Sequence, residues 1–216
     1  MSTPEPAALT KLRAHRLLAV IRASSPAAAR GAARAVAEGG IPIVEVTYSV
    51  PDAPGVMAEL AGRDDLVVGA GTVLTERQAH AALAAGARFI VAPNFDPAVA
   101  RIALAAGVLY VPGAYTTTEI IAARAAGAHL IKVYPVGVAG GPAYITVIRD
   151  PLPDVPMLAA GGTNLDNVVP FLEAGCVACG LGGALADPKL AADGRFDEIA
   201  ARARAFVERV RRFAGA

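Results

Sequence analysis

The chain is constrained most by a regular alternation of apolar, strand-like runs with alanine-rich segments of helical pattern. Eight such runs occur in 216 residues, roughly 27 residues per unit, which is the size of a compact strand–helix repeat. Continuous apolar strands joined by helices are typical of a parallel sheet buried on both faces. The predicted strands cover residues 17–21, 43–47, 66–71, 88–92, 108–111, 128–134, 157–160 and 176–181.

Helix-boundary signals fill the intervals between these runs. Ser25 before Pro26 and Asp96 before Pro97 are typical of capped helix starts, and Thr75 is a further capping residue. Glycines recur where the helical patterns end, as expected for C-caps. The predicted helices cover residues 7–16, 26–38, a segment after 52, 76–85, 97–106, a segment from Thr117 or Thr118 to 126, 143–149, 164–174 and 196–213.

Eight repeated units favour a closed barrel over an open doubly wound sheet. No glycine-rich dinucleotide fingerprint follows the first predicted strand, which weakens the open alternative. We therefore expect an α/β protein, a (β/α)8 TIM barrel with an additional N-terminal helix, forming a single domain over residues 1–216.

Composition narrows the classes of partner. The formal net charge is +1 and the basic residues are scattered, so we expect no nucleic-acid partner. The apolar runs are of strand length, and the first ten residues lack a signal-peptide pattern, so we expect a cytoplasmic protein without membrane association. Cys176 and Cys179 form a C-x-x-C pair without a second ligand pair, and we interpret them as core residues rather than a metal or redox site.

One strand carries a lysine where an apolar residue is expected. Lys132 lies in the middle of the run 128–134, and alternation places Lys132 and Tyr134 on one face of that strand. Burial disfavours the ammonium form of a lysine, which makes the neutral amine available as a nucleophile. A lysine that snorkels to solvent or pairs with a carboxylate is the alternative interpretation.

A second ionisable residue lies alone in another apolar strand. Glu45 shares its strand face with Ile43 and Thr47. Two buried groups of opposite charge are costly unless they share a cavity, so Glu45 and Lys132 are predicted to meet. A structural ion pair across the barrel is one interpretation, and a Schiff-base lysine with a proton-shuttling carboxylate is the other.

Further polar or glycine-rich positions follow the predicted strands, where barrel enzymes build their active sites. Thr72 is a turn residue or a ligand for a carboxylate. The glycine pairs after the last two strands are tight turns or a phosphate cradle made of backbone N–H groups. The candidate positions are Arg22, Glu45, Thr72, Pro93, Lys132, Gly161, Gly162, Gly182 and Gly183.

An ordered set of these motifs, spanning residues 20–185, resembles the KDPG/KHG aldolase family, whose members cleave 2-keto-3-deoxy-6-phosphogluconate or 4-hydroxy-2-oxoglutarate. Two stretches, 92–94 and 141–145, favour the branch that acts on 2-keto-3-deoxy-6-phosphogalactonate. The motifs are EVT at 45–47, GAGTVL at 69–74, APN at 92–94, VPG at 111–113, IKVYP at 131–135, GG at 161–162 and GLG at 180–182.

The resemblance implies a role for each candidate residue. Lys132 forms an imine with the 2-keto group, and Glu45 moves protons during cleavage to pyruvate and an aldehyde such as glyceraldehyde 3-phosphate. Thr72 and the backbone near Pro93 hold the pyruvate carboxylate, and Arg22 meets an anionic group. The imine supplies the electron sink, so the expected aldolase needs no metal or other cofactor. The resemblance also implies a homotrimer that takes a small-molecule keto acid.

Three positions depart from the family pattern. Ser49 stands where many members have arginine, Gly183 where many have serine, and Thr146 where the galactonate branch often has lysine. Each change removes a charge or a donor from the substrate-binding rim. A 4-hydroxy-2-oxoglutarate or non-phosphorylated keto-acid aldolase therefore stays open as an alternative. A phosphosugar isomerase or epimerase, or an inactive phosphate-binding barrel, is a second alternative.

Overall fold

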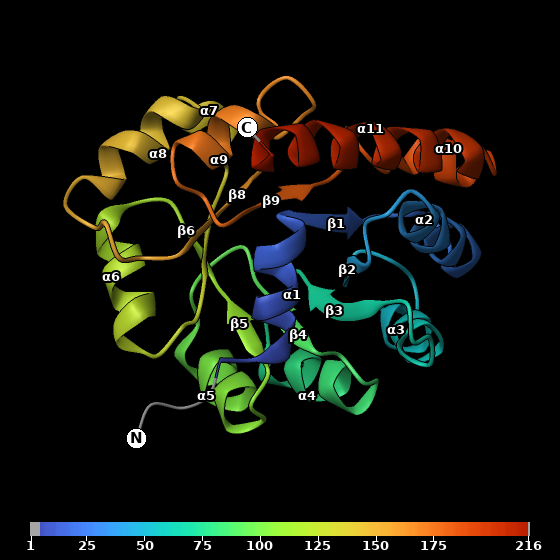
Figure 1. Ribbon diagram of the computed structural model, residues 1–216. Coiled ribbons are helices and arrows are strands. Elements are labelled where there is room, and N and C mark those ends of the chain that lie inside the picture. The colour runs from blue at the N-terminus through green and yellow to red at the C-terminus, as the bar shows by residue number, and fades with distance from the viewer. Residues whose placement is uncertain (1–4, 216) are drawn as a thin grey trace.

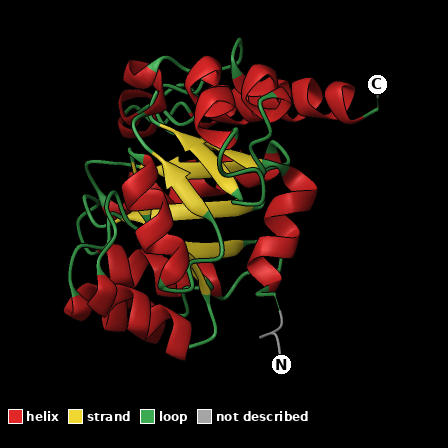
Figure 2. Ribbon diagram, turned by 90° about the vertical axis from the view of Figure 1, so that its left-hand side faces the viewer, coloured by secondary structure: helices red, strands yellow, loops and turns green. Residues whose placement is uncertain are grey.

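A computed structural model describes residues 5–215. Its strands form one parallel sheet that curls into a barrel, and helices cover the outside (Figures 1 and 2). The predicted α/β barrel is therefore confirmed. The strands are β1 (Leu17–Ile21), β2 (Ile43–Thr47), β3 (Val67–Gly71), β4 (Phe89–Val91), β5 (Leu109–Val111), β6 (Gly113–Ala114), β7 (Ile131–Val133), β8 (Met157–Ala160) and β9 (Ala178–Leu181).

The barrel is nearly closed, and the gap falls just after the fifth predicted strand, between residues 111 and 113. The strand order is β5-β4-β3-β2-β1-β9-β8-β7-β6, so β5 and β6 are the two ends of the order although they are consecutive in the chain. Pro112 separates them, because it has no backbone N–H to donate to a ladder. Its carbonyl oxygen instead accepts from the Lys132 N–H at 2.9 Å. The described residues thus hold nine strands in place of eight.

The three helices that follow the capping signals at Ser25, Thr75 and Asp96 start where those signals predicted. Ser25 Oγ accepts from the Ala28 N–H at 3.2 Å, and Asp96 Oδ1 accepts from two N–H groups of the helix that it starts. The predicted N-terminal helix is present as α1. The helices are α1 (Ala7–His15), α2 (Pro26–Glu38), α3 (Ala53–Ala61), α4 (Glu76–Ala84), α5 (Pro97–Ala105), α6 (Thr117–Ala125), α7 (Val136–Ala139), α8 (Pro142–Arg149), α9 (Val168–Glu173), α10 (Pro188–Ala192) and α11 (Phe196–Ala214).

The predicted cap of α6 is wrong by at least one residue. Thr116, rather than Thr117 or Thr118, is the N-cap, and its Oγ1 accepts from the Glu119 N–H at 3.4 Å. The Glu119 carboxylate accepts in return from the Thr116 N–H at 2.8 Å. Three consecutive threonines leave the start ambiguous, and the glutamate three residues after Thr116 completes a capping box at that position only.

Helix α9 begins later than predicted, at Val168 rather than at residue 164. Asn164 Oδ1 accepts from the N–H groups of Asp166 and Asn167, and Asn167 Oδ1 accepts from the Asn164 N–H at 2.8 Å. These side chains satisfy the backbone in a turn, which is why asparagine competes with helix formation. The short helices α7 and α10 lie in segments for which no helix was predicted.

The apolar side chains form two layers separated by the sheet, as the strand alternation predicted. Ile131 and Val133 belong to the outer layer, between the strands and the helices. The inner layer fills the barrel, and it includes Ile43 from the face of β2 that carries Glu45. Cys176 and Cys179 are free and buried in the outer layer, which confirms their interpretation as core residues.

Helix α1 closes one end of the barrel (Figure 1). Leu9 and Leu12 of α1 are 2% and 1% exposed, and they pack in the inner layer. The partners of α1 in this layer include the first residues of several strands, such as Leu109 of β5 and Ala178 of β9. The amino-terminal end of the barrel is therefore filled by apolar side chains, and the carboxyl ends of the strands are left for a site.

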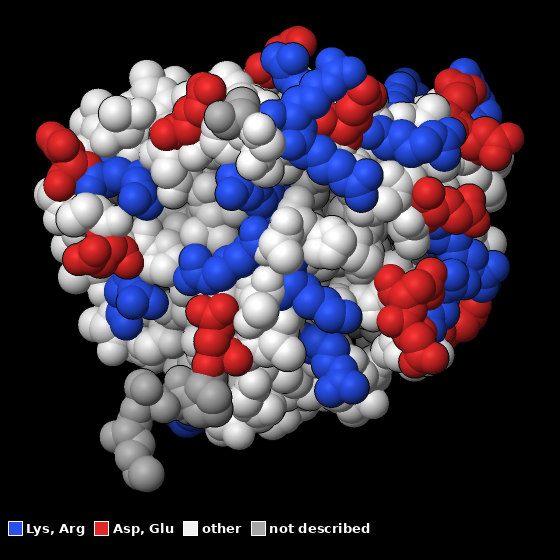
Figure 3. Space-filling model, in the orientation of Figure 1, with Lys and Arg blue, Asp and Glu red and all other residues white. Residues whose placement is uncertain are grey.

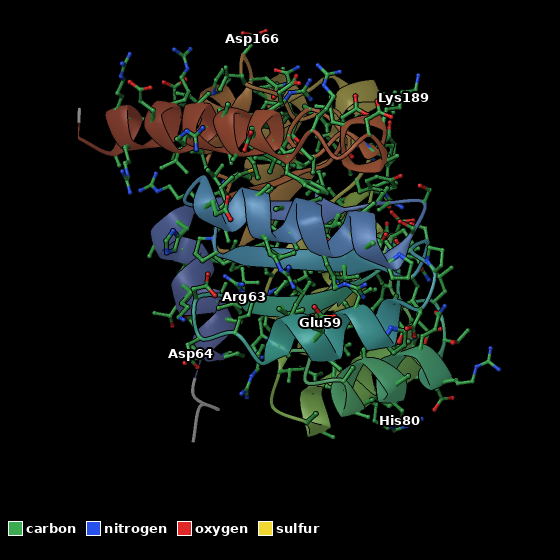
Figure 4. All side chains as sticks on the ribbon, turned by 90° about the vertical axis from the view of Figure 1, so that its right-hand side faces the viewer. Glu59, Arg63, Asp64, His80, Asp166 and Lys189 are labelled. Carbon is green, nitrogen blue, oxygen red and sulfur yellow. The ribbon has the colours of Figure 1, made fainter. Side chains whose placement is uncertain are left out.

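Charged residues lie mostly on the outside. Figure 3 shows several Lys and Arg side chains across the middle of the face that α1 covers, with acidic side chains beside them. Glu59 of α3 pairs with Arg30 and Arg34 of α2, which ties two neighbouring helices together (Figure 4). None of the described helices is both long enough and apolar enough to cross a membrane.

Candidate active site

A cavity of about 460 Å³ opens at the carboxyl ends of β1, β7, β8 and β9. It brings together six of the nine candidate residues, from strands and loops far apart in the sequence. The lining residues are Val20, Arg22, Lys132, Tyr134, Ala160, Gly161, Gly162, Thr163, Asn164, Gly180, Gly182, Gly183 and Ala184. Glu45, Thr72 and Pro93 are outside this lining, at the ends of the neighbouring strands β2, β3 and β4.

Lys132 lies in β7, between Gly113 of β6 and Leu158 of β8 in the strand register. Its side chain is 6% exposed and lines the cavity. The Lys132 Nζ atom lies 5.0 Å from the centre of the Tyr134 ring, at a distance that allows a cation–π interaction. The predicted orientation of Lys132 and Tyr134 on one strand face is thus confirmed, and a buried amine points into an open cavity.

Glu45 in β2 is 1% exposed, and both of its carboxylate oxygens lack a hydrogen-bond partner among the described residues. Burial raises the pKa of the Glu45 carboxyl, and the positive charges of Lys132 and Arg22 oppose that rise. The carboxylate is therefore near both cations without a close ion pair to either. An unpartnered buried carboxyl with a raised pKa is suited to gain and lose a proton.

Gly71 makes room for this carboxylate. A Cβ atom built on Gly71 would lie 1.9 Å from Glu45 Oε1, so any larger residue at the end of β3 would displace the Glu45 side chain. Thr72 follows at once with a φ of 57°, a left-handed conformation that is uncommon for threonine. Backbone strain of this kind concentrates at functional sites, because surrounding structure has to hold it in place.

Pro93 lies against the strand beside Lys132. A Cβ atom built on Gly113 would be 2.1 Å from the Pro93 carbonyl oxygen, and Gly113 is opposite Lys132 in the register. The β4 and β6 ends can approach this closely only because position 113 has no side chain. Thr72, Pro93 and Glu45 thus lie on the β2–β4 side of the barrel end, and the cavity lies on the β1 and β7–β9 side.

The two glycine pairs form the wall opposite the β2–β4 side. Gly161 and Gly162 have φ values of 78° and 113°, which explains glycine at both positions. A Cβ atom built on Gly182 or Gly183 would meet nothing within 4 Å, so the backbone there is accessible from the cavity. The loop geometry is compatible with a backbone cradle for an anion.

Several lining residues were not among the candidates. Tyr134 could have been found, because it lies two residues after Lys132 on the same strand face. Thr163 is 6% exposed, and its hydroxyl donates to the Gly180 carbonyl, which joins the β8 and β9 loops. The sequence offered no signal for that contact. Among residues 5–215, no group of three or more His, Cys, Asp or Glu side chains is arranged to hold a metal ion.

Comparison with known proteins identifies the family. The family model described as "KDPG and KHG aldolase" matches residues 9–202. A probable 2-dehydro-3-deoxy-6-phosphogalactonate aldolase from Rhizobium meliloti is 38% identical over 180 residues, covering 82% of this chain and 84% of that protein. The solved structure described as native KDPGal has a TM-score of 0.83 and 32% identity, and covers 93% of this chain and 96% of its own.

A second solved structure is informative about chemistry. KDPG aldolase from Legionella pneumophila, captured with pyruvate as a covalent carbinolamine intermediate, has a TM-score of 0.84 and 26% identity. The alignment covers 94% of this chain and 98% of that one. The family match extends over most of the chain and includes Glu45, Thr72 and Lys132. The chain therefore belongs to the KDPG and KHG aldolase family.

Proposed function

We propose that this protein is a class I aldolase that cleaves a 2-keto-3-deoxy sugar acid, phosphorylated at C6, to pyruvate and an aldehyde. The observation that carries the proposal is the pairing of a buried amine with an unpartnered buried carboxyl. Lys132 is 6% exposed and faces the cavity, and Glu45 is 1% exposed and close enough for its proton affinity to respond to Lys132.

In the first half of the reaction, the Lys132 amine attacks the C2 carbonyl carbon and forms a carbinolamine. Loss of water, with protons moved by Glu45, gives an iminium that withdraws electrons from C3. Glu45 then accepts the proton of the C4 hydroxyl, directly or through a water, and the C3–C4 bond breaks. The aldehyde leaves, and the bond electrons remain as an enamine on the pyruvate fragment.

In the second half, the enamine takes a proton at C3 and becomes the pyruvate iminium. Water adds at C2, and the C–N bond breaks to give pyruvate and the free Lys132 amine. The water expelled during imine formation is balanced by the water consumed in hydrolysis. The raised pKa of Glu45 supports its proposed role, because the carboxyl has to alternate between the protonated and ionised forms.

The remaining candidates are proposed to bind the substrate. Thr72 and the backbone at Pro93 would hold the C1 carboxylate on the β2–β4 side. Arg22 and the glycines at 161, 162, 182 and 183 would hold an anionic group in the cavity that Lys132 lines. The accessible backbone at Gly182 and Gly183 supports a phosphate ligand, since N–H groups can bind phosphate without the serine that many family members have.

The substrate is proposed to be 2-keto-3-deoxy-6-phosphogalactonate or its gluconate epimer at C4. Similarity to the probable 2-dehydro-3-deoxy-6-phosphogalactonate aldolase from Rhizobium meliloti supports the first of these two. Comparing kcat/KM for both phosphorylated acids, their non-phosphorylated forms and 4-hydroxy-2-oxoglutarate would decide among them. A higher kcat/KM for the unphosphorylated acids would contradict the phosphate assignment and leave the imine chemistry intact.

The imine itself is tested by reduction. Borohydride added with pyruvate should fix a pyruvate-derived adduct on Lys132, detected by peptide mass mapping. The chain has two other lysines, Lys11 and Lys189, and both should stay unmodified. Lys132→Ala should abolish pyruvate release in a coupled lactate dehydrogenase assay, whereas Lys189→Ala should leave it unchanged. An unmodified Lys132 with full turnover would contradict the proposal and favour an isomerase or epimerase.

The single domain over residues 1–216, the cytoplasmic location and the homotrimer are proposed on the same family relationship. Exposed apolar side chains support an assembly, because such side chains often mark a protein–protein interface. Four large exposed apolar side chains come from residues 115–147, namely Tyr115, Ile121, Val138 and Val147. Light scattering should give a mass of three chains of 21.8 kDa each. A monomer across micromolar concentrations would contradict the trimer.

A further inference from the structure

Two hydroxyl groups connect the side chain of Arg22 back to its own backbone. The Thr47 and Ser49 hydroxyl oxygens are 2.7 Å apart, and the Thr47 hydroxyl is 3.0 Å from the Ile21 carbonyl oxygen. Arg22 Nη1 lies 3.4 Å from the Ser49 hydroxyl oxygen. Ile21 is the residue before Arg22, so the three contacts form a closed loop between the ends of β1 and β2.

The direction of each hydrogen bond in this loop follows from counting protons. A carbonyl oxygen can only accept, so the Thr47 hydroxyl donates its single proton to Ile21. Thr47 can then only accept from Ser49, which uses the Ser49 proton. The Ser49 lone pairs are left for the Arg22 guanidinium, which has N–H donors and no acceptor. The loop therefore runs in one direction, from Arg22 through Ser49 and Thr47 to Ile21.

The inner part of the loop is rigid and its outer part holds a flexible side chain. Thr47 is fully buried in β2, two residues after Glu45 and on the same strand face. Its hydroxyl is already satisfied by the Ile21 carbonyl, so burial of Thr47 does not require Ser49. Ser49 and Arg22 are exposed, and an exposed arginine samples many rotamers unless something restrains it.

Arg22 is the cationic side chain that shares the cavity lining with Lys132 in the described part of the chain. Its charge also acts on Glu45. Burial raises the pKa of the Glu45 carboxyl, and the positive charge of Arg22 partly offsets that rise. The orientation of Arg22 thus affects both the cavity that receives an anion and the group that moves protons. A contact that restrains the Arg22 side chain should therefore affect how the substrate binds.

We propose that Thr47 and Ser49 are positioning residues, whose hydroxyls hold the Arg22 guanidinium over the cavity to receive an anionic group of the substrate. The inference rests on the proposed aldolase function, which supplies the anionic substrate. Neither hydroxyl touches the reacting atoms. Removing a hydroxyl should therefore weaken binding of the substrate while the cleavage step proceeds at nearly its normal rate.

The first test removes the Ser49 hydroxyl. Ser49→Ala should raise KM by about 3- to 10-fold, the effect of losing one hydrogen bond, with kcat within about twofold. Ser49→Thr keeps the hydroxyl and should restore KM. Ser24→Ala is the matched control, because Ser24 is an exposed serine of the loop after β1 with no hydrogen bond found for its side chain in residues 5–215. Ser24→Ala should leave KM unchanged.

The second test asks whether Ser49 acts through Arg22. Arg22→Gln should raise KM more than Ser49→Ala does, and the double variant should match Arg22→Gln alone. If Ser49 had a structural role instead, the fold-increases in KM of the two single variants would multiply in the double variant. Thermal melting of the variants would then show a loss of stability. Thr47→Val, which keeps the side-chain shape, should repeat the Ser49→Ala effect, with Thr47→Ser as its rescue.

The choice of substrate shows which anion Arg22 receives. A KM effect confined to the phosphorylated acid would assign the phosphate, and an equal effect with the unphosphorylated acid would assign the carboxylate. An unchanged KM for both acids in Ser49→Ala would overturn the inference, provided that the parent enzyme forms the borohydride-trapped adduct. Without that adduct in the parent enzyme, the proposed function itself would fail instead.

Discussion

Glu45 occupies an environment that opposes its ionised form. Its carboxylate is buried, lacks hydrogen-bond partners among the described residues, and lies against the backbone of Gly71. The residue pattern predicted that Glu45 and Lys132 would meet, because two isolated ionisable groups appeared in apolar strands. It could not predict the absence of a close ion pair, because that depends on the distance between side chains of two non-adjacent strands.

Replacing Glu45 should separate its effect on the free energy of folding from its proposed role in catalysis. Burial raises the pKa of the native Glu45 carboxyl above the ordinary 4.5, so the native state holds a proton that the unfolded chain releases. The contribution of Glu45 to stability is then most favourable below pH 4.5, and it is lost as the pH rises from 4.5 through the native pKa. Glu45→Gln removes this penalty, so its melting temperature should exceed the parent's by a margin that grows from pH 4.5 up to the native pKa of Glu45 and is constant above it.

The same substitution should lower kcat by about 10²- to 10⁴-fold, because the proposed acid–base group is lost. Glu119→Gln is the control, and its effect on the melting temperature above pH 4.5 should have the opposite sign. Hydrogen bonds from the Thr116 and Tyr115 N–H groups lower the pKa of Glu119, so its ionised form stabilises the native state above pH 4.5. Melting curves that show no growing margin for Glu45→Gln would indicate that the Glu45 carboxylate is well paired.

At the scale of elements, the local sequence predicted the boundaries that depend on local patterns. It was wrong where a contact between residues determines the end of a strand or the start of a helix. The strand at 43–47 and the start of α2 agree with the pattern, because alternation and Ser25–Pro26 act locally. The fifth strand was predicted to end at residue 111, and the short β6 that follows Pro112 and pairs with β7 was not predicted. The starts of α6 and α9 depend on which side chain caps the backbone, and the sequence offered several candidates for each.

The capping box of α6 gives a prediction with matched controls in the same three residues. Thr116→Ala should lower the free energy of unfolding by about 1 kcal/mol, because the Glu119 N–H loses its acceptor. Thr117→Ala and Thr118→Ala should each change it by less than about 0.5 kcal/mol, since surface substitutions away from such features have small effects. Urea denaturation at one protein concentration would measure all three, and a larger loss at Thr117 would contradict the assigned cap.

Over the whole molecule, the two ends of the barrel differ in composition: one end holds the candidate site, and the other holds apolar packing. The carboxyl end carries the strained Thr72, the buried Glu45 and the glycine loops, which all cost stability. The amino end is filled by apolar side chains, with α1 packed over the strand starts. The N-terminal helix was predicted from its pattern, but its place was not, because an amphipathic helix of nine residues carries no signal for the end of a barrel that it covers.

This division predicts that stability and activity can be changed separately. Leu12 is 1% exposed and packs in the inner layer, so Leu12→Ala should lower the free energy of unfolding by about 2–5 kcal/mol through lost burial and a cavity. The site lies at the opposite end of the barrel, so kcat at 25 °C should stay within about twofold. Leu165→Ala is the control for stability, because Leu165 is 39% exposed and its truncation should cost far less. A large fall in kcat for folded Leu12→Ala would show that α1 also supports the geometry of the site.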